Sequence, residues 1–374
     1  MTRLYWIPLL VAVLHGCAAP TTRYQQPDAR AVAEEAARQR ALALQLYQER
    51  TRRLHHVSWP LLVAAAPLCQ KHTRWLTGVI LANPFQFREA FRKTAHDAMG
   101  LGDEVITVTD VVPGSPAARA GLAPGDVIVE VAGEALGPVE DADTAAEAIA
   151  GYGEVVRQGE PFAVTVRRGR DLLQMQLTPV QACDSPVVLA DSDVVNAWAD
   201  GKRVHVTRGI MRFTRNDQEL ALVIGHELAH NIERHVEAKM QNAMGGAIVD
   251  AMFGAATGYS TRGAFARAAS QAYSQAFEME ADYVGLYLMA RAGLPLENAS
   301  LFWRRMAAEQ PASITAGHTA THPATPARFQ AIEQTIAEIR ARQQAGQPLL
   351  PERRQPAGEL PAGGDPEDEF DDES

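Results

Sequence analysis

The sequence feature that most constrains the fold is a pair of histidines with a glutamate beside the first, in the stretch His226-Glu227-Leu228-Ala229-His230. Residues four apart lie one turn from each other on the same side of an α-helix, so both imidazoles can bind one Zn²⁺ ion if this segment is helical. Asn216 followed three residues later by Glu219 is typical of a helix start. The pattern therefore predicts a helix that begins there and carries two metal ligands.

Glu227 lies next to the histidine pair, where its carboxylate can act as the general base on a water molecule. Two histidines on one helix are more often surface residues or hydrogen-bonded core residues than ligands. This helix, however, has an apolar run around the motif, and burying two imidazoles and a carboxylate without a metal would leave polar groups unsatisfied. We therefore predict that His226 and His230 bind a metal and that Glu227 is catalytic.

A third ligand has to come from elsewhere in the chain. Metzincins use a histidine ten positions after the first, but that position is a valine here and His235 is one residue out of place, which excludes this class. A later helical segment offers Glu278 and Asp282, four residues apart on one face. Glu278 can complete a site for one Zn²⁺ ion per chain, Asp282 can orient a ligand imidazole, and Glu280 points elsewhere.

The N-terminus carries the signs of an export signal. Arg3 precedes the apolar run from Leu4 to Leu14, which is too short to span a bilayer. The next residues, up to Cys17, resemble a bacterial lipobox, and this resemblance implies a membrane attachment through a lipid on Cys17. A plain secretory signal cut nearby is the alternative. Ala18, by the same resemblance, favours the periplasmic side of the outer membrane.

The segment 99–180 is rich in short β-type runs and resembles a PDZ domain of the bacterial protease-associated kind. Ser115, Pro116 and Gly121 occupy the positions of a helix cap, first turn and end within its Pro-Gly-Ser-Pro-Ala-Ala-Arg-Ala-Gly string. PDZ domains bind extended peptide ends by strand addition. The glycine loop at 100–102 precedes two acidic residues that would repel a peptide carboxylate, so a spacer or regulatory role without a specified ligand has equal standing.

The expected export and the inserted domain together indicate how the cysteines pair. With Cys17 acylated, Cys69 and Cys183 are the two that remain, and an oxidising compartment favours a disulfide between them. Two buried thiols are the alternative. Since one cysteine precedes the PDZ segment and the other follows it, the bond would hold the two ends of the insertion together.

Several segments resemble, in order and spacing, the gluzincin family that contains CAAX prenyl proteases, HtpX and BepA-like periplasmic peptidases. They are Asn196-Ala197-Trp198, Val206-Thr207-Arg208-Gly209-Ile210, residues 226–230 and Glu278-Met279-Glu280-Ala281-Asp282. The resemblance implies that His226, His230 and Glu278 bind zinc and that Glu227 is the base. It also implies that Asn196, Ala197 and Trp198 form an edge strand along which the substrate lies.

A further segment, residues 321–328, resembles the His-Pro loop of the BepA-like members. This resemblance implies that His322 is a regulatory fourth ligand of the metal that keeps the enzyme latent. Arg328 at the end of this segment can pair with an acidic side chain or bind a substrate carbonyl.

The composition excludes other classes of protein. Of 374 residues, 47% are hydrophobic and 21% charged, which is typical of globular domains. The net charge is −10, and seven acidic groups lie in the last ten residues, so nothing indicates a nucleic-acid partner. The apolar segment 243–258 is too short to span a membrane and contains Asp250. We expect it to form either a mobile lid over the cleft, which can also touch lipid, or a plain packed helix.

We therefore predict an α+β protein: a mostly helical zinc-peptidase domain with a small sheet, interrupted by a β-rich PDZ domain. The predicted parts are a signal peptide (1–17), a tether and helix (18–53), peptidase segments (54–98 and 181–340), the PDZ domain (99–180) and a disordered acidic tail (341–374). The predicted function is a metalloendopeptidase of the bacterial envelope that cleaves unfolded or misassembled envelope proteins. A chaperone-like or peptide-binding protein with a structural or blocked zinc site is the alternative.

Overall fold

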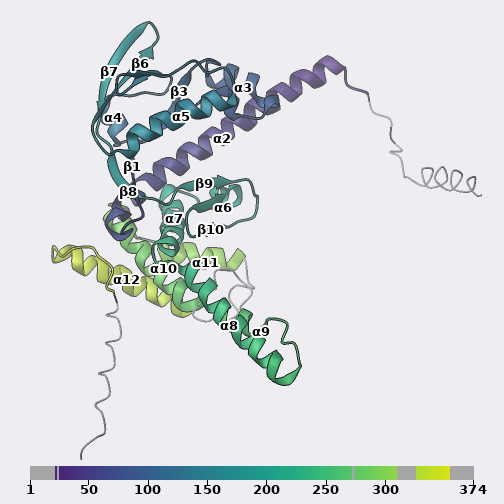
Figure 1. Cartoon of the computed structure of the whole chain (residues 1–374), viewed down its shortest axis with the longest axis vertical. Helices are drawn as coiled ribbons and strands as arrows, with labels where there is room; N and C mark the ends of the chain where they lie inside the picture. Colours follow the sequence, from purple (N-terminus) through teal and green to yellow (C-terminus); the bar gives the residue numbers. More distant parts are fainter. Residues whose placement is uncertain (1–21, 23–24, 272–273, 310–325, 354–374) are drawn as a thin grey trace, which may run out of the picture.

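The computed structural model describes residues 22, 25–271, 274–309 and 326–353, and these form an α+β fold, as predicted. A β-rich PDZ unit lies at one end, a helical unit with a small sheet lies beside it, and a helical hairpin projects from the helical unit (Figure 1). The long helix α2 runs alongside both units.

Helix α2 (Ala29–Ala65) begins where the side chain of Asp28 accepts a hydrogen bond from the backbone N–H of Ala31 at 3.2 Å. We expected a surface helix that ends near residue 53, but α2 continues for a further twelve residues and includes Pro60. Its second half is apolar on one face and packs into the core of the helical unit. The buried apolar residues of that half are Leu54, Val57, Leu61, Leu62 and Ala65.

The PDZ unit is built on a six-stranded sheet in the order β2-β3-β4-β6-β7, with β5 paired to β4. The strands are β2 (Val79–Ala82), β3 (Ile106–Val111), β4 (Val127–Val131), β5 (Glu134–Ala135), β6 (Phe162–Arg168) and β7 (Asp171–Leu177). Helices α3 (Glu89–Met99), α4 (Pro116–Ala120) and α5 (Ala142–Arg157) and the 3₁₀ turn η2 (Pro84–Gln86) complete it. Ser115 caps α4 and Gly121 ends it with φ +90°, as the sequence predicted.

The sheet of this unit also includes a strand that precedes the predicted start at residue 99. Strand β2 pairs antiparallel with β3, with Val79 opposite Val111, so the sheet already includes residue 79. Within the glycine segment 100–102, Gly100 ends α3 in the left-handed conformation and Leu101 is buried. A four-residue strand followed by Pro84 carries too little periodicity to be assigned from sequence.

A short two-stranded sheet closes the neck between the two units. Strand β1 (Thr73–Leu76) pairs antiparallel with β8 (Val180–Cys183). Just before β1, after the 3₁₀ turn η1 (Ala66–Leu68), Cys69 forms a disulfide with Cys183, and their Cα atoms are 5.6 Å apart. The chain therefore leaves and re-enters the helical unit at one covalently closed point.

The helical unit contains a three-stranded sheet in the order β10-β11-β9 and a set of packed helices. The strands are β9 (Val187–Ala190), β10 (Ala197–Ala199) and β11 (Val204–Thr207). The helices are α6 (Arg208–Phe213), α7 (Asp217–Ile232), α8 (His235–Thr257), α9 (Ala264–Gln271), α10 (Ser274–Arg291), α11 (Ala299–Glu309) and α12 (Pro326–Gln344).

Helices α7 and α10 cross at two glycines. A Cβ atom on Gly225 would lie 3.2 Å from the carbonyl oxygen of Gly285, and one on Gly285 would lie 3.0 Å from the backbone of Gly225. A side chain at either position would push the helices apart, so these glycines permit the close crossing. The residues next to the crossing are those predicted to bind the metal.

Residues 243–257 lie in α8, and Gly258 ends this helix. Helix α8 forms an antiparallel hairpin with α9 (Figure 1). Among the described residues, no helix combines the length and apolarity that crossing a bilayer requires. Of the tail predicted to be disordered at 341–374, residues 341–344 instead form the last turn of α12. Residues 354–374 lie outside the described part of the chain.

Replacing both Cys69 and Cys183 by serine should lower the free energy of unfolding by about 2–5 kcal/mol, because the bond joins positions 114 residues apart. Thermal unfolding of the exported protein, with and without the substitutions, measures this change. Thiol titration of denatured, unreduced protein should detect neither cysteine. Two reactive thiols in that titration would contradict the disulfide.

Candidate metal centre

Helix α7 carries the two histidines, and its start has the predicted local basis. The side chain of Asn216 accepts a hydrogen bond from the backbone N–H of Glu219 at 2.9 Å. The Glu219 carboxylate does not return to Asn216 as in a full capping box; it accepts from the backbone of Arg215 and pairs with Arg305. From this start, the helix places His226 and His230 one turn apart, both buried.

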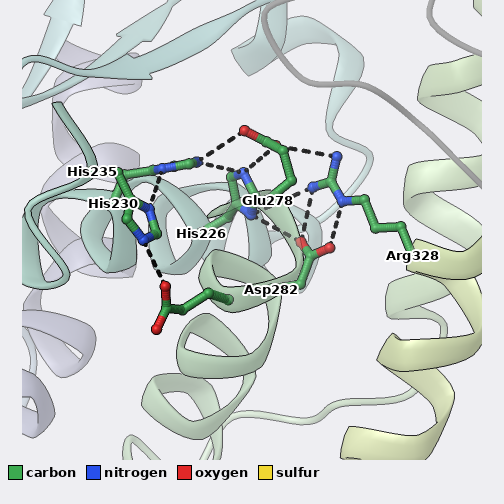
Figure 2. Close-up of polar contacts among 7 residues, drawn as sticks. His226, His230, His235, Glu278, Asp282 and Arg328 are labelled. Atoms are coloured by element: carbon green, nitrogen blue, oxygen red, sulfur yellow. Dashed lines mark hydrogen bonds and ion pairs between the residues drawn. The ribbon is translucent and has the colours of Figure 1, made fainter. Parts of the chain in front are cut away.

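The structure brings His226, His230 and Glu278 together around one point. The Nε2 atoms of the two histidines are 3.2 Å apart, and they lie 3.3 and 3.4 Å from the carboxylate oxygens of Glu278. Figure 2 shows the two imidazole rings from α7 facing the Glu278 carboxylate from α10. All three side chains are buried, and they form a group that can hold a metal ion.

These separations fit a tetrahedral zinc site. With bonds of about 2.0–2.1 Å to zinc, neighbouring ligand atoms are about 3.3–3.4 Å apart. The measured 3.2–3.4 Å match this value, and two imidazoles with one carboxylate are a common zinc donor set. Since three protein ligands leave one tetrahedral position for water or substrate, the donor set is typical of a catalytic site.

Asp282 contacts the side of the His226 ring that faces away from the metal-binding group, and Arg328 in turn contacts Asp282. The Nδ1 atom of His226 lies 2.9 Å from Oδ1 of Asp282, and the Arg328 guanidinium donates to the same carboxylate at 2.9 Å. Burial favours the neutral imidazole, but the hydrogen bond and charge of Asp282, with those of Glu278, outweigh it and raise the pKa of metal-free His226 to about 9. Asp282 thus occupies the position predicted for a residue that orients a ligand.

His235 holds the second histidine in a similar way, a role that we did not predict. Its Nδ1 atom lies 2.8 Å from Nδ1 of His230, and its Nε2 atom lies 3.0 Å from the half-exposed carboxylate of Glu280. The Phe277 ring stacks on it, with ring centroids 4.6 Å apart. If His230 offers Nε2 to a metal, its Nδ1–H donates to His235, which in turn donates to Glu280.

A break between α7 and α8 explains this contact. Residues 230 and 235 would point in different directions on a continuous helix, but Arg234 adopts the left-handed conformation with φ +56°. The turn brings His235 back beside His230. Burial lowers the pKa of His230 to about 4, although the hydrogen bond and charge of Glu278 partly oppose this shift. His230 is therefore neutral near pH 7, which is the state that binds a metal.

Glu227 is buried beside the metal-binding group. Its negative charge acts on both His230 and Arg328, so its carboxylate lies near the ligands from α7 and near the arginine from α12. This is the neighbourhood in which a base for a water molecule is required.

The predicted substrate strand lies at a sheet edge. Strand β10, which contains Ala197 and Trp198, pairs with β11 on one side, and it is the last strand in the sheet order among the described strands. Asn196 precedes β10, and its backbone N–H donates to the Thr207 hydroxyl at 3.3 Å. Trp198 is 37% exposed and stacks on His205, while β10 itself packs on α7.

Arg328 is paired with buried acidic side chains. It is buried, lies 3.3 Å from the Glu278 carboxylate in addition to its Asp282 contacts, and has its guanidinium 4.8 Å from the centroid of the Trp303 ring. Of the two roles considered from sequence, the structure shows the pairing with acids. His322 lies outside the described residues.

Comparison with known families identifies two domains. Residues 168–336 match the model of Peptidase family M48, and residues 107–168 match a PDZ domain. The chain therefore contains an M48 peptidase domain, a gluzincin, together with an inserted PDZ domain. These matches support a metallopeptidase, and the group formed by His226, His230 and Glu278 lies within the M48 match.

The individual relatives cover a smaller part. A curated protein named "Putative serine protease HhoB", from Synechocystis sp. (strain ATCC 27184 / PCC 6803 / Kazusa), is 40% identical over 77 residues, which is 21% of this chain and 17% of that protein. The HtrA3 PDZ domain bound to a phage-derived ligand is 26% identical over 30% of this chain and 89% of that domain, with a TM-score of 0.21. A serine endoprotease from Yersinia pestis is 23% identical over 30% of each chain, with a TM-score of 0.20.

His235→Ala should weaken zinc binding by about 10–100-fold, because it removes the acceptor that fixes the ring and tautomer of His230. Competition with a chromophoric chelator measures the zinc affinity, and the absorption spectrum of the Co²⁺ form reports the ligand geometry. His96→Ala, at an exposed histidine of α3, is the matched control. An unchanged affinity in the His235 variant would contradict the orienting role.

Arg328→Met should lower the free energy of unfolding by about 3–5 kcal/mol, since it leaves two buried carboxylates without their cation. Urea denaturation followed by circular dichroism measures the loss. Arg340→Met on the same helix breaks an exposed pair with Glu297 and should change stability by less than about 1 kcal/mol. Unchanged stability of the Arg328 variant, with a raised KM for a peptide, would instead restore the substrate-binding interpretation.

Proposed function

We propose that this chain is a zinc-dependent metalloendopeptidase of the bacterial cell envelope. The observation that carries this proposal is the buried group of His226, His230 and Glu278, whose ligand atoms have the spacing of a tetrahedral zinc site. The position of Glu227 beside this group adds a proton acceptor. The M48 match of residues 168–336 supports the peptidase chemistry.

Each residue of the site has a separate chemical role. His226, His230 and Glu278 would hold the zinc ion, which supplies Lewis acidity for the scissile carbonyl and for the attacking water. Glu227 accepts a proton from this water and later donates it to the amine that leaves. Asp282 and His235 keep the two imidazoles in the ligand tautomer, and Arg328 balances the charge of the two carboxylates next to it.

Strand β10 provides a means of holding the substrate. An extended peptide can add to a free sheet edge through backbone hydrogen bonds, which do not depend on sequence. Because β10 packs on α7, a peptide on this edge would lie beside the helix that carries Glu227. Unfolded chains present far more such segments than folded proteins do, so this edge supports unfolded or misassembled proteins as substrates.

The envelope location rests on the N-terminal sequence. The leader at 1–17, the lipobox-like residues up to Cys17 and a disulfide between Cys69 and Cys183 agree with export to an oxidising compartment. We therefore place the protein on the periplasmic side of the outer membrane, held by an N-terminal lipid. Latency through His322 stays a proposal from sequence.

Glu227→Gln should leave zinc content and stability unchanged while lowering the cleavage rate by at least about 10²–10⁴-fold, because the amide preserves the shape but cannot accept the proton. Release of fragments from unfolded casein, together with metal analysis of the same samples, measures both. Glu147→Gln, at an exposed glutamate of α5, is the control. Undiminished, chelator-insensitive cleavage would contradict zinc catalysis. Zinc without any cleavage by either the wild-type protein or a His322→Ala variant, which removes the proposed latency, would refute the enzyme assignment and favour a chaperone-like protein.

A further inference from the structure

The α8–α9 hairpin concentrates the exposed apolar side chains of the molecule. Eight of the eighteen large hydrophobic residues that are exposed in the described chain lie between positions 240 and 265. Prominent among them are Met244, Ile248, Met252 and Phe253 on α8, Tyr259 in the turn and Phe265 on α9. Met252 is 67% exposed and Tyr259 is 76% exposed. A concentration of exposed apolar side chains of this kind marks an interaction site.

The hairpin is a packed structure with its own internal contacts. A Cβ atom on Gly246 would lie 2.4 Å from the carbonyl oxygen of Phe265, so the backbone of α9 rests directly on α8 at this glycine. The Asp250 carboxylate accepts hydrogen bonds from the backbone N–H groups of Phe265 and Ala266 at 3.1 and 2.9 Å, and from the Thr261 hydroxyl. The apolar side chains are therefore presented outward by a defined scaffold.

Beyond Glu237 and Lys239 near the start of α8, the charges of the hairpin are few and unequal. From residue 243 to residue 269 the charged side chains are Asp250, Arg262 and Arg267. Asp250 is engaged within the hairpin, whereas both arginines are exposed. Arg267 donates to the backbone carbonyl of Arg262 at 2.6 Å. In a chain with a net charge of −10, this surface is thus apolar and locally cationic.

We propose that the α8–α9 hairpin docks on the surface of a bilayer that contains anionic phospholipids. Helices with an apolar surface, aromatic side chains and basic residues bind at the headgroup boundary without spanning the membrane. The arginines can extend to lipid phosphates while the apolar side chains enter the acyl boundary. Methionine-rich surfaces also bind proteins, but the single sign of the exposed charge here favours anionic headgroups.

Such docking would fix the peptidase domain relative to the membrane. The hairpin follows α7 directly through Arg234 and leads into α10, and these two helices carry the metal-binding residues. A membrane contact at α8–α9 would therefore hold the candidate catalytic centre at a set height above the lipid. This inference does not depend on peptidase activity.

The test uses the mature chain, residues 18–374, exported behind a cleavable leader so that no N-terminal lipid is attached. We expect it to float with vesicles of phosphatidylglycerol and phosphatidylcholine. The double variant Met252→Glu with Phe253→Glu should reduce this binding by about tenfold or more. Arg262→Gln with Arg267→Gln should remove the preference over pure phosphatidylcholine. Leu172→Glu, on β7 of the PDZ unit and 65% exposed, should bind as the wild type does.

A second readout locates the contact. Tyr259→Trp should show a blue-shifted emission and quenching by brominated acyl chains on the same vesicles, whereas Leu172→Trp should show neither. Absence of vesicle binding by the wild-type chain, or binding that the hairpin substitutions leave unchanged, would overturn the proposal. So would hairpin substitutions that alter only self-association in sedimentation velocity, or only casein cleavage without vesicles, because these outcomes identify a second copy or a substrate as the occupant.

Discussion

The candidate metal centre depends on the close crossing of α7 and α10. Glycine at both 225 and 285 lets the two backbones approach to a distance that a single methyl group would prevent. His226 follows one of these glycines, and Asp282 precedes the other by less than one turn, so their hydrogen bond at 2.9 Å is a direct consequence of the crossing. A wider crossing would move Glu278 away from both imidazoles, because the carboxylate and the imidazoles come from different helices.

This crossing buries charges that need compensation within the protein. Glu278 and Asp282 are both buried, and isolated carboxylates in that environment would be strongly destabilising. Arg328, from a third helix, contacts both of them, with the result that the pKa of Asp282 is held low despite its burial. The core around α7, α10 and α12 is thereby linked to the site: folding of the helical unit and orientation of the ligands use the same contacts.

Sequence predicted those parts of the site that follow from local periodicity. The spacing of His226 and His230 is set within one helix, and that of Glu278 and Asp282 within another. The disulfide was predicted because export favours disulfides and because Cys69 and Cys183 are the two cysteines that remain besides Cys17. His235 was missed because its contact with His230 depends on the left-handed Arg234, which breaks the helical period at a residue without glycine's preference for that conformation. The role of Arg328 and the early start of the PDZ sheet at β2 depend on contacts between distant segments, which no local pattern specifies.

The break at Arg234 has two structural consequences. It turns His235 back toward His230, and it sends α8 away from the helical unit, so that the segment between the second histidine and Glu278 both supports a ligand and forms the projecting hairpin (Figure 1). Because Phe277 at the start of α10 stacks on His235 at the start of α8, the two ends of the hairpin meet at the ligand-supporting contact. His235 and Phe277 thus connect the base of the projecting hairpin to the metal-binding residues, since His235 contacts His230 and Phe277 directly precedes Glu278.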